Sequence, residues 1–222
     1  MMKNILLVTL VLFSILACND TDNGTTTGTT DSTNTVTNND AMDHSNMNMD
    51  TSGLAGKDMM STMHTMVTNM KAIQSTGNPD NDFAALMKAH HLSAVEMAQL
   101  ELARGADPEL KRIAQKAIDE QQVEIAQLNT FLSGHTAHGG GDAFYKEAMK
   151  SMDKMKMDMD HSGSVDKQFA QMMIPHHQSA IDMSNAYIKS GAHEEALKKI
   201  ANNIISSQEK EIAELQAWLG KH

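Results

Sequence analysis

The sequence predicts an all-α protein, a four-helix bundle made of two repeated helical hairpins, each preceded by a methionine-rich helix. Three observations support this fold class. Prolines are nearly absent, with 3 in 222 residues. Long stretches carry apolar residues at helical spacing and are separated by glycine-containing turn signals. The second half of the chain repeats the pattern of the first half.

Helix start and stop signals divide the chain into six predicted helices. The first helix stops at Gly77-Asn78-Pro79, and Asp107-Pro108 supplies an N-cap followed by proline at the first helical position. Gly139-Gly140-Gly141 is a flexible break between the halves, and Gly163 and Gly191 separate the later helices. The predicted helices cover residues 57–73, 82–105, 108–132, 142–159, 166–190 and 193–219.

An internal repeat relates the two halves of the chain. The stretch from Phe83 through His90-His91 to Met97 aligns with the stretch from Phe169 through His176-His177 to Met183. We therefore predict a first helical repeat over residues 57–134 and a second over 142–222. Their four amphipathic helices favour one four-helix bundle, although two three-helix lobes would satisfy the same pattern.

The N-terminal residues resemble the secretion signal of a bacterial lipoprotein. Residues 1–17 contain a short basic start and an apolar run too short to span a bilayer. Ala17-Cys18 then matches the lipobox, so we expect cleavage before Cys18 and lipidation of its thiol. Residues 18–56 are rich in Thr and Asn and predict a disordered tether. The expected location is the bacterial cell envelope, lipid-anchored and facing the periplasm or the exterior.

Composition restricts the chemistry that is available. The formal net charge of −10 argues against nucleic-acid binding, because phosphate recognition needs clustered Lys and Arg. The single cysteine excludes an intramolecular disulfide and a multi-thiolate metal site. With 20 methionines and 11 histidines, a soft-metal protein of this composition would use thioether and imidazole ligands.

Paired histidines with methionine one or two turns away are the main candidate metal ligands. Residues four or seven apart share a helix face. In the second repeat the candidates are Met172, Met173, His176, His177 and Met183. In the first repeat they are Met87, His90, His91 and Met97, and Leu86 stands where the second repeat has Met172. Neutral thioether sulfur favours Cu(I) and Ag(I), so copper(I) is the expected ion, with silver(I) and copper(II) as alternatives.

The methionine-rich helices and two polar segments add further candidate ligands. Met stripes at heptad spacing usually form core, but these helices have few other large apolar residues, so both core and ligand roles stay open. The motif Met-Asp-His-Ser occurs twice in polar segments, where core packing does not explain methionine. The candidates here are Met42, His44 and Met47 in the tether, Met63 and His64 in the first helix, and Met152, Met155, Met159 and His161 in the fourth helix and the segment after it.

Carboxylates near the histidine pairs have a possible supporting role. Glu96 and Asp182 lie beside the Met–His face and are predicted to orient a metal-binding imidazole without binding the metal themselves. Glu124 and Glu211 are instead assigned to a solvated face or to inter-helix hydrogen bonds. No Glu precedes a His by three residues, so the di-iron motif of catalytic bundles is absent from the sequence.

The run from Phe169 through Met172-Met173-Ile174-Pro175-His176-His177-Gln178 to Met183 resembles the signature of a bacterial family catalogued as domain of unknown function 305. The late helix from Gln208 to Trp218-Leu219 resembles its second landmark. The resemblance implies a ferritin-like four-helix bundle, secretion and, for several members, copper binding and tolerance. It implies site residues Met172, Met173, His176, His177 and Met183. The first repeat departs from this pattern at Leu86, Ala89 and Leu92.

The function that the sequence favours is an envelope copper(I)-binding lipoprotein, without enzymatic activity, that sequesters, buffers or delivers copper. Its expected partners are metal ions, the membrane through the N-terminal lipid, and a copper-handling protein. Two alternatives stay open. One is a ferritin-like metal-dependent redox enzyme, and the other is a metal-independent interaction lipoprotein whose methionine surface binds hydrophobic partners.

Overall fold

The computed structural model describes residues 52–153, 155, 162–191 and 194–222, and this part of the chain is helical without any strand. The helices are η2 (Ser52–Leu54, a 3-10 turn), α1 (Met59–Ala72), α2 (Pro79–Arg104), α3 (Pro108–Gly134), α4 (Ala143–Asp153), α5 (Val165–Lys189) and α6 (Glu195–Leu219). The all-α prediction is confirmed. The predicted helix over 142–159 was too long, because α4 ends at Asp153.

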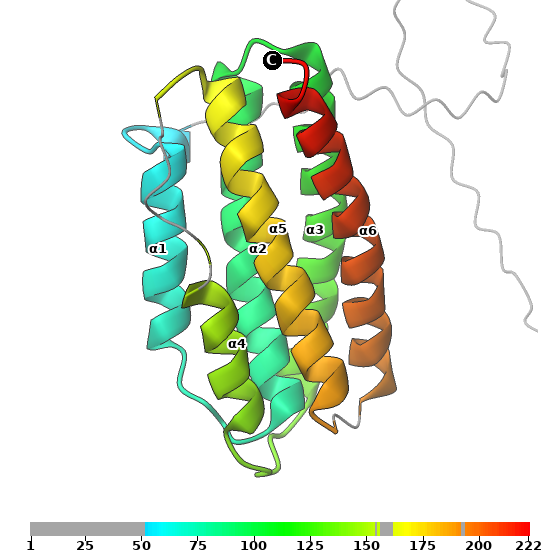
Figure 1. Cartoon of the computed structure of the whole chain (residues 1–222). Helices are drawn as coiled ribbons and strands as arrows, with labels where there is room; N and C mark the ends of the chain where they lie inside the picture. The colour runs from blue at the N-terminus through cyan, green and yellow to red at the C-terminus, as the bar shows by residue number, and fades with distance from the viewer. Residues whose placement is uncertain (1–51, 154, 156–161, 192–193) are drawn as a thin grey trace, which may run out of the picture. The chain divides into compact units, whose positions relative to one another are not determined.

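Helices α2 and α5 form the central layer of the structure. Figure 1 shows them between α1 and α4 on one side and α3 and α6 on the other. Each hairpin packs within itself, α2 on α3 and α5 on α6, and the hairpins meet mainly where α2 contacts α5. All these helices belong to one compact unit, so the arrangement is one bundle rather than two lobes.

Local sequence fixes the starts of the long helices. Asn78 accepts hydrogen bonds from the backbone N–H groups of Asp80 and Asn81, and Pro79 occupies the first turn. Asp107 and Pro108 repeat this arrangement at the start of α3. Side-chain caps satisfy N–H groups that have no partner inside the helix, and proline loses nothing there because its nitrogen carries no hydrogen.

The central position of α2 and α5 explains how their residues are buried. Both helices bury residues on several faces, because each has neighbours on two sides. Pro175 lies inside α5, which continues through it. A proline in a helix interior removes one backbone hydrogen bond, and packing on both sides of α5 compensates for that loss.

Methionine supplies much of the core on the α1 and α4 side. In α1, Met59, Met63, Met66 and Met70 are each no more than 2% exposed, and Met152 and Met155 are also buried. The α1 stripe, Met152 and Met155 therefore belong to the core, which leaves their possible role as ligands untested. Flexible thioether side chains fill irregular gaps well, and they place sulfur inside the protein beside α2 and α5.

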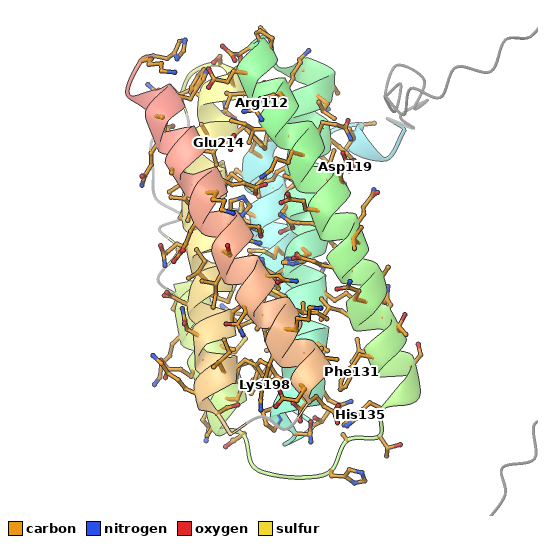
Figure 2. All side chains as sticks on the ribbon, turned by 90° about the vertical axis from the view of Figure 1, so that its right-hand side faces the viewer. Arg112, Asp119, Phe131, His135, Lys198 and Glu214 are labelled. Atoms are coloured by element: carbon orange, nitrogen blue, oxygen red, sulfur yellow. The ribbon has the colours of Figure 1, made fainter. Side chains whose placement is uncertain are left out.

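The α3 and α6 layer is held together at both ends. Figure 2 shows this face, where Arg112 of α3 and Glu214 of α6 form an ion pair at 2.8 Å. Towards the other end, Nε2 of His135, just after α3, lies 3.3 Å from Oε1 of Glu194, just before α6. None of the described helices combines the length and the apolar run that a bilayer-spanning helix requires.

Matching aspartates at the starts of α2 and α5 connect the two repeats. Asp80 accepts a hydrogen bond from the hydroxyl of Tyr187, whose ring stacks on Phe83 with centroids 4.2 Å apart. At the other end of the central layer, Asp166 accepts hydrogen bonds from the backbone N–H groups of Ala106 and Asp107. Each aspartate therefore ties the first turn of its helix to the opposite repeat.

We predict that Tyr187→Phe destabilises the protein by about 1–3 kcal/mol, because the buried carboxylate of Asp80 loses a hydroxyl donor while the aromatic stack stays. Urea unfolding measures this change. Tyr145→Phe is the matched control, since its half-buried hydroxyl donates only to the backbone carbonyl of Ile73. We expect a smaller loss for the control, and equal losses would contradict the prediction.

Candidate metal centre

Two histidines from different repeats meet at the contact of α2 with α5. The ring centroids of His90 and His176 lie 3.8 Å apart, and both side chains are fully buried. Nε2 of His90 lies 2.7 Å from the hydroxyl of Ser179, and Nε2 of His176 lies 2.7 Å from the hydroxyl of Ser93. Each imidazole is therefore held by a serine of the opposite helix.

The serine hydroxyls determine which imidazole nitrogen carries the proton. Ser93 and Ser179 donate to the backbone carbonyls of His90 and His176, at 2.8 and 2.7 Å. Because a carbonyl oxygen, or the sulfur of Met66 beside Ser93, can only accept, we assign the hydroxyl hydrogens to these acceptors, and each hydroxyl then accepts from the Nε2–H of the opposite imidazole. This assignment leaves a lone pair on Nδ1 of both rings, and neither Nδ1 has a partner in the described part of the chain.

Electrostatics keeps these two imidazoles neutral. Burial lowers the pKa of His90 and His176 well below the usual value of 6.5, and neighbouring imidazoles lower each pKa further. A neutral imidazole with a free lone pair is the form that binds a metal ion. The pair is thus ready to accept a cation without first releasing a proton.

The second histidine of each pair faces the α3 and α6 layer. Nε2 of His91 and Oε2 of Glu124 are 2.7 Å apart, and Nε2 of His177 and Oε2 of Glu211 are 2.9 Å apart. A carboxylate behind an imidazole orients the ring and makes its other nitrogen a better metal ligand. Nδ1 of both rings is buried and unpartnered among the described residues.

Glu211 is held as a carboxylate. Burial alone would raise its pKa, but the contact with His177 and the ammonium of Lys116, 3.0 Å from Oε1, together lower it. Glu124 has more solvent exposure, and no lysine of the described part of the chain forms an ion pair with it. The two pairs differ in alignment as well as in charge environment, because His91 and Glu124 form a hydrogen bond, whereas Nε2 of His177 lies close to Glu211 without hydrogen-bond geometry.

Thioethers accompany all four imidazoles. By helical spacing, Met87 shares a face with His91, and Met173 shares a face with His177. The other predicted thioether ligands of α2 and α5, Met97, Met172 and Met183, follow the face of His90 and His176, and all five side chains are no more than 2% exposed. The sulfur of Met66 lies 2.8 Å from the Ser93 hydroxyl, which places the α1 stripe beside the same imidazoles.

Other predicted ligands lie elsewhere. His64 is exposed while Met63 is buried, so these two candidates point to different environments. Met152 is buried in α4, and Met155 is buried just after it. Met159, His161, Met42, His44, Met47 and Cys18 lie outside the described residues.

The two predicted supporting carboxylates, Glu96 and Asp182, are half-buried. Glu96 forms an ion pair with Lys57, and Asp182 accepts a hydrogen bond from Gln178. The imidazoles of the buried pairs are contacted instead by Glu124 and Glu211, which the sequence left to a solvated face or to inter-helix bonds. The inter-helix alternative is the one that the structure shows.

Sequence reasoning missed the serines that hold His90 and His176. The signal was present, because His-His-x-Ser occurs in both repeats, ending at Ser93 and at Ser179. It also assigned no role to Gln121 and Gln208, whose amide groups are buried in α3 and α6 without a partner in the described part of the chain. Matching positions in the two repeats mark all four residues.

A site rich in hard ligands is not formed by the described side chains. Among them, no three His, Cys, Asp or Glu residues converge as a metal site. The available donors are instead single imidazole nitrogens beside thioether sulfur, in a water-poor interior. Two or three such ligands suit a soft monovalent ion of low coordination number better than a hard or octahedral one.

Comparison with known proteins gives a family and a fold relative. A family model described as "Domain of unknown function (DUF305)" matches residues 20–132 and 80–219. The solved structure of CopM in the apo form is 28% identical, with a TM-score of 0.50 over 64% of this chain and 96% of that one. CopM in a silver-bound form obtained by co-crystallization is 28% identical, with a TM-score of 0.51 and the same coverage. CopM in the Cu(I)-bound form is 26% identical with a TM-score of 0.49, covering 67% and 98%. No curated protein matches the chain.

We predict that His90 and His176 stay neutral, with the proton on Nε2, in the folded protein at pH 5.5. Nitrogen-15 NMR of the imidazole rings measures this directly, and the urea-unfolded chain is the protonated reference. Because the folded pKa is depressed, the stability that these histidines contribute is present above the unfolded pKa of about 6.5. It is lost as the pH falls through the folded pKa.

Ser179→Ala tests the assigned tautomer. It removes the acceptor for Nε2–H of His90, so only His90 should show a mixed or altered tautomer, while His176 keeps its bond to Ser93. Ser133→Ala is the control, since Ser133 donates to a backbone carbonyl at the surface of α3. Fully protonated rings at pH 5.5, or no change at His90 in the variant, would contradict the assignment.

Proposed function

This chain belongs to the family of domain of unknown function DUF305, and we propose that it binds copper(I) through buried imidazole and thioether ligands. The proposed role is to sequester, buffer or deliver copper in the bacterial cell envelope and so to give copper tolerance. One observation carries the proposal. Four buried histidines present an unpartnered Nδ1, and buried methionines share their helix faces.

The donor chemistry selects the ion. Thioether sulfur is soft and neutral, and with imidazole it favours Cu(I) and Ag(I) over hard divalent ions. The match to CopM in a silver-bound form supports this choice, because Ag(I) and Cu(I) share charge and ligand preference. Copper(II) would use the imidazole nitrogens and would gain little from the sulfur.

The geometry supports two kinds of binding position. The first lies where His90 and His176 meet, so ligands from both repeats would hold the same ion. The second is the Met–His pair one turn apart, formed by Met87 with His91 and by Met173 with His177. In the second kind, Glu124 and Glu211 contact the Nε2 side and leave Nδ1 for the ion.

We propose a binding protein rather than an enzyme. A ferritin-like redox centre needs several carboxylates and histidines around shared metal ions. The described side chains do not form such a group. The capture of hydrophobic partners by a methionine surface also finds little support, since the methionines of α1, α2 and α5 that the sequence singled out are mostly in the core.

The anchoring of the protein to the envelope rests on the N-terminal sequence. Residues 1–17 and Cys18 carry the lipoprotein pattern, and they lie outside the described residues. Cell fractionation tests this part of the proposal. We expect the intact chain in the membrane fraction and Cys18→Ala to lose that association, whereas equal membrane association of both chains would contradict lipidation.

We predict that Met172→Leu, Met173→Leu and Met183→Leu each weaken Cu(I) binding while the fold is kept. Leucine has a similar volume, so packing changes little, but the thioether is gone. Removing a residue that binds the ion directly should lower the affinity by more than the 10–100-fold that is typical when a residue that only orients a ligand is removed. Competition with a chromogenic Cu(I) chelator, and native mass spectrometry with Cu(I), Ag(I) and Zn(II), measure affinity and ion count.

The first repeat offers a matched variant that should change the Cu(I) affinity in the opposite direction. Leu86 is buried and stands where the second repeat has Met172, so Leu86→Met adds a thioether at an equivalent place. We expect Leu86→Met to tighten Cu(I) binding. The proposal fails if the unaltered chain retains no Cu(I) against the chelator, or if the leucine variants bind as tightly as it does.

A further inference from the structure

A buried carboxyl pair lies at the end of the bundle where α2 finishes and α5 begins. Glu101, near the end of α2, is completely buried, and among the described residues no N–H donor reaches either of its side-chain oxygens. The neighbouring carboxyl group is Asp166, at the start of α5. Asp166 already accepts two backbone N–H groups, at 2.8 and 2.7 Å.

The internal repeat shows what Glu101 does. Glu101 lies eleven residues after His90, and Tyr187 lies eleven residues after His176, so the two occupy the same place in their repeats. Asp80 and Asp166 are equivalent in the same way. At one end of the central layer, the hydroxyl of Tyr187 donates to Asp80. At the other end a glutamate stands in the position of that donor, and it can donate only when it carries a proton.

We propose that Glu101 is held in its protonated form and donates to the carboxylate of Asp166, forming a proton-dependent clasp between the two repeats. The proton belongs on Glu101 because Asp166 has two N–H donors to stabilise its charge and Glu101 has none. Loss of the proton would leave two adjacent buried carboxylates without a hydrogen between them. The clasp therefore weakens as the pH rises, whereas the Tyr187 bond at the opposite end does not.

The surroundings of Glu101 support this assignment. From α5 it faces Asp166, and from the start of α3 it faces Asp107 and Lys111; Lys167 and His222 line the same cleft as Asp107 and Asp166. Burial, then the charge and contact of Asp166, raise the pKa of Glu101 from 4.5 to about 8, and only Lys111 opposes them. The pKa of Asp166 stays below its ordinary value, because its backbone donors and the contact with Glu101 outweigh the effect of burial.

Gly105 makes room for the clasp. A Cβ added at this position would lie closer to Oε1 of Glu101 than any real carbon–oxygen contact allows. The backbone N–H of Gly105 meanwhile donates to the carbonyl of Glu101 at 2.8 Å, which closes the end of α2. A side chain at position 105 would therefore displace the carboxyl group that binds Asp166.

The direction of the pH effect follows from linkage. Between pH 4.5 and about 8 the folded protein keeps the Glu101 proton and the unfolded chain does not. The stabilisation from this proton is therefore complete below pH 4.5 and is lost as the pH rises through about 8. The buried histidines contribute the same pH dependence to the unaltered chain and to a variant changed only at position 101, so the difference between the two chains isolates Glu101.

The test compares urea unfolding of the full chain and of Glu101→Gln from pH 6.5 to 9.5. The glutamine amide can donate to Asp166 and cannot lose a proton. We expect the unfolding equilibrium constant of the unaltered chain to rise, relative to the variant, by up to about tenfold per pH unit until pH 8. Tyr187→Phe is the control and should shift stability equally at every pH in this range.

Direct titration keeps the proposal testable if Glu101→Gln folds poorly. Carbon-13 NMR of the Glu101 carboxyl group in the unaltered chain should show a midpoint near the value given by burial and Asp166, about 8. In Asp166→Asn the same midpoint should fall, because the neighbouring negative charge is gone. Titration of Glu101 near pH 4.5, or parallel stability curves for the unaltered chain and Glu101→Gln, would overturn the proposal.

Discussion

The contact between α2 and α5 is the constraint on which the rest of the structure depends. Where the helices meet, His90 and His176 lie ring against ring, and each is hydrogen-bonded to a serine of the opposite helix. These polar groups are fully buried, so their bonds must all be made in one register. A shift of α2 along α5 would break both serine bonds at once. The other four helices then pack against a pair whose relative position is already determined.

Duplication explains why this contact is nearly symmetric and why the departures from symmetry matter. Equivalent residues make equivalent bonds where His90 and His176 contact the serines of the opposite helix. The exceptions are few. Leu86 replaces Met172, Lys116 supports Glu211 without a lysine at the equivalent place, Asn203, and Glu101 replaces Tyr187. Each exception changes the charge or the number of sulfur atoms at a position that is equivalent in the two repeats. The repeats therefore share a backbone arrangement and differ in side-chain chemistry.

The sequence predicted the helices, the repeat and the histidine pairs, because these follow from spacing within one helix. It could not predict which helix faces which. Glu124 and Glu211 looked like surface residues, since α3 and α6 carry many polar side chains, yet the histidines of the central layer reach them. Glu96 and Asp182 lie near the histidines in sequence, but Glu96 pairs with Lys57, and Asp182 accepts a hydrogen bond from Gln178. The layer order of six helices decides these contacts, and no local pattern encodes it.

A metal ion that enters this core would bring a positive charge into a place with little water. Imidazole and thioether ligands are neutral and cannot compensate that charge. Glu124 and Glu211 can, because their carboxylates lie against the far side of His91 and His177. The pair of His90 and His176 is backed only by serine hydroxyls. Charge compensation therefore favours a metal ion at the Met–His positions on the α3 and α6 side. In the second repeat, where sulfur is more abundant, Lys116 neutralises part of the negative charge of Glu211. The first repeat thus offers more uncompensated negative charge and less sulfur, and the second offers less charge and more sulfur. This difference would give one chain sites of different affinity for the same soft ion.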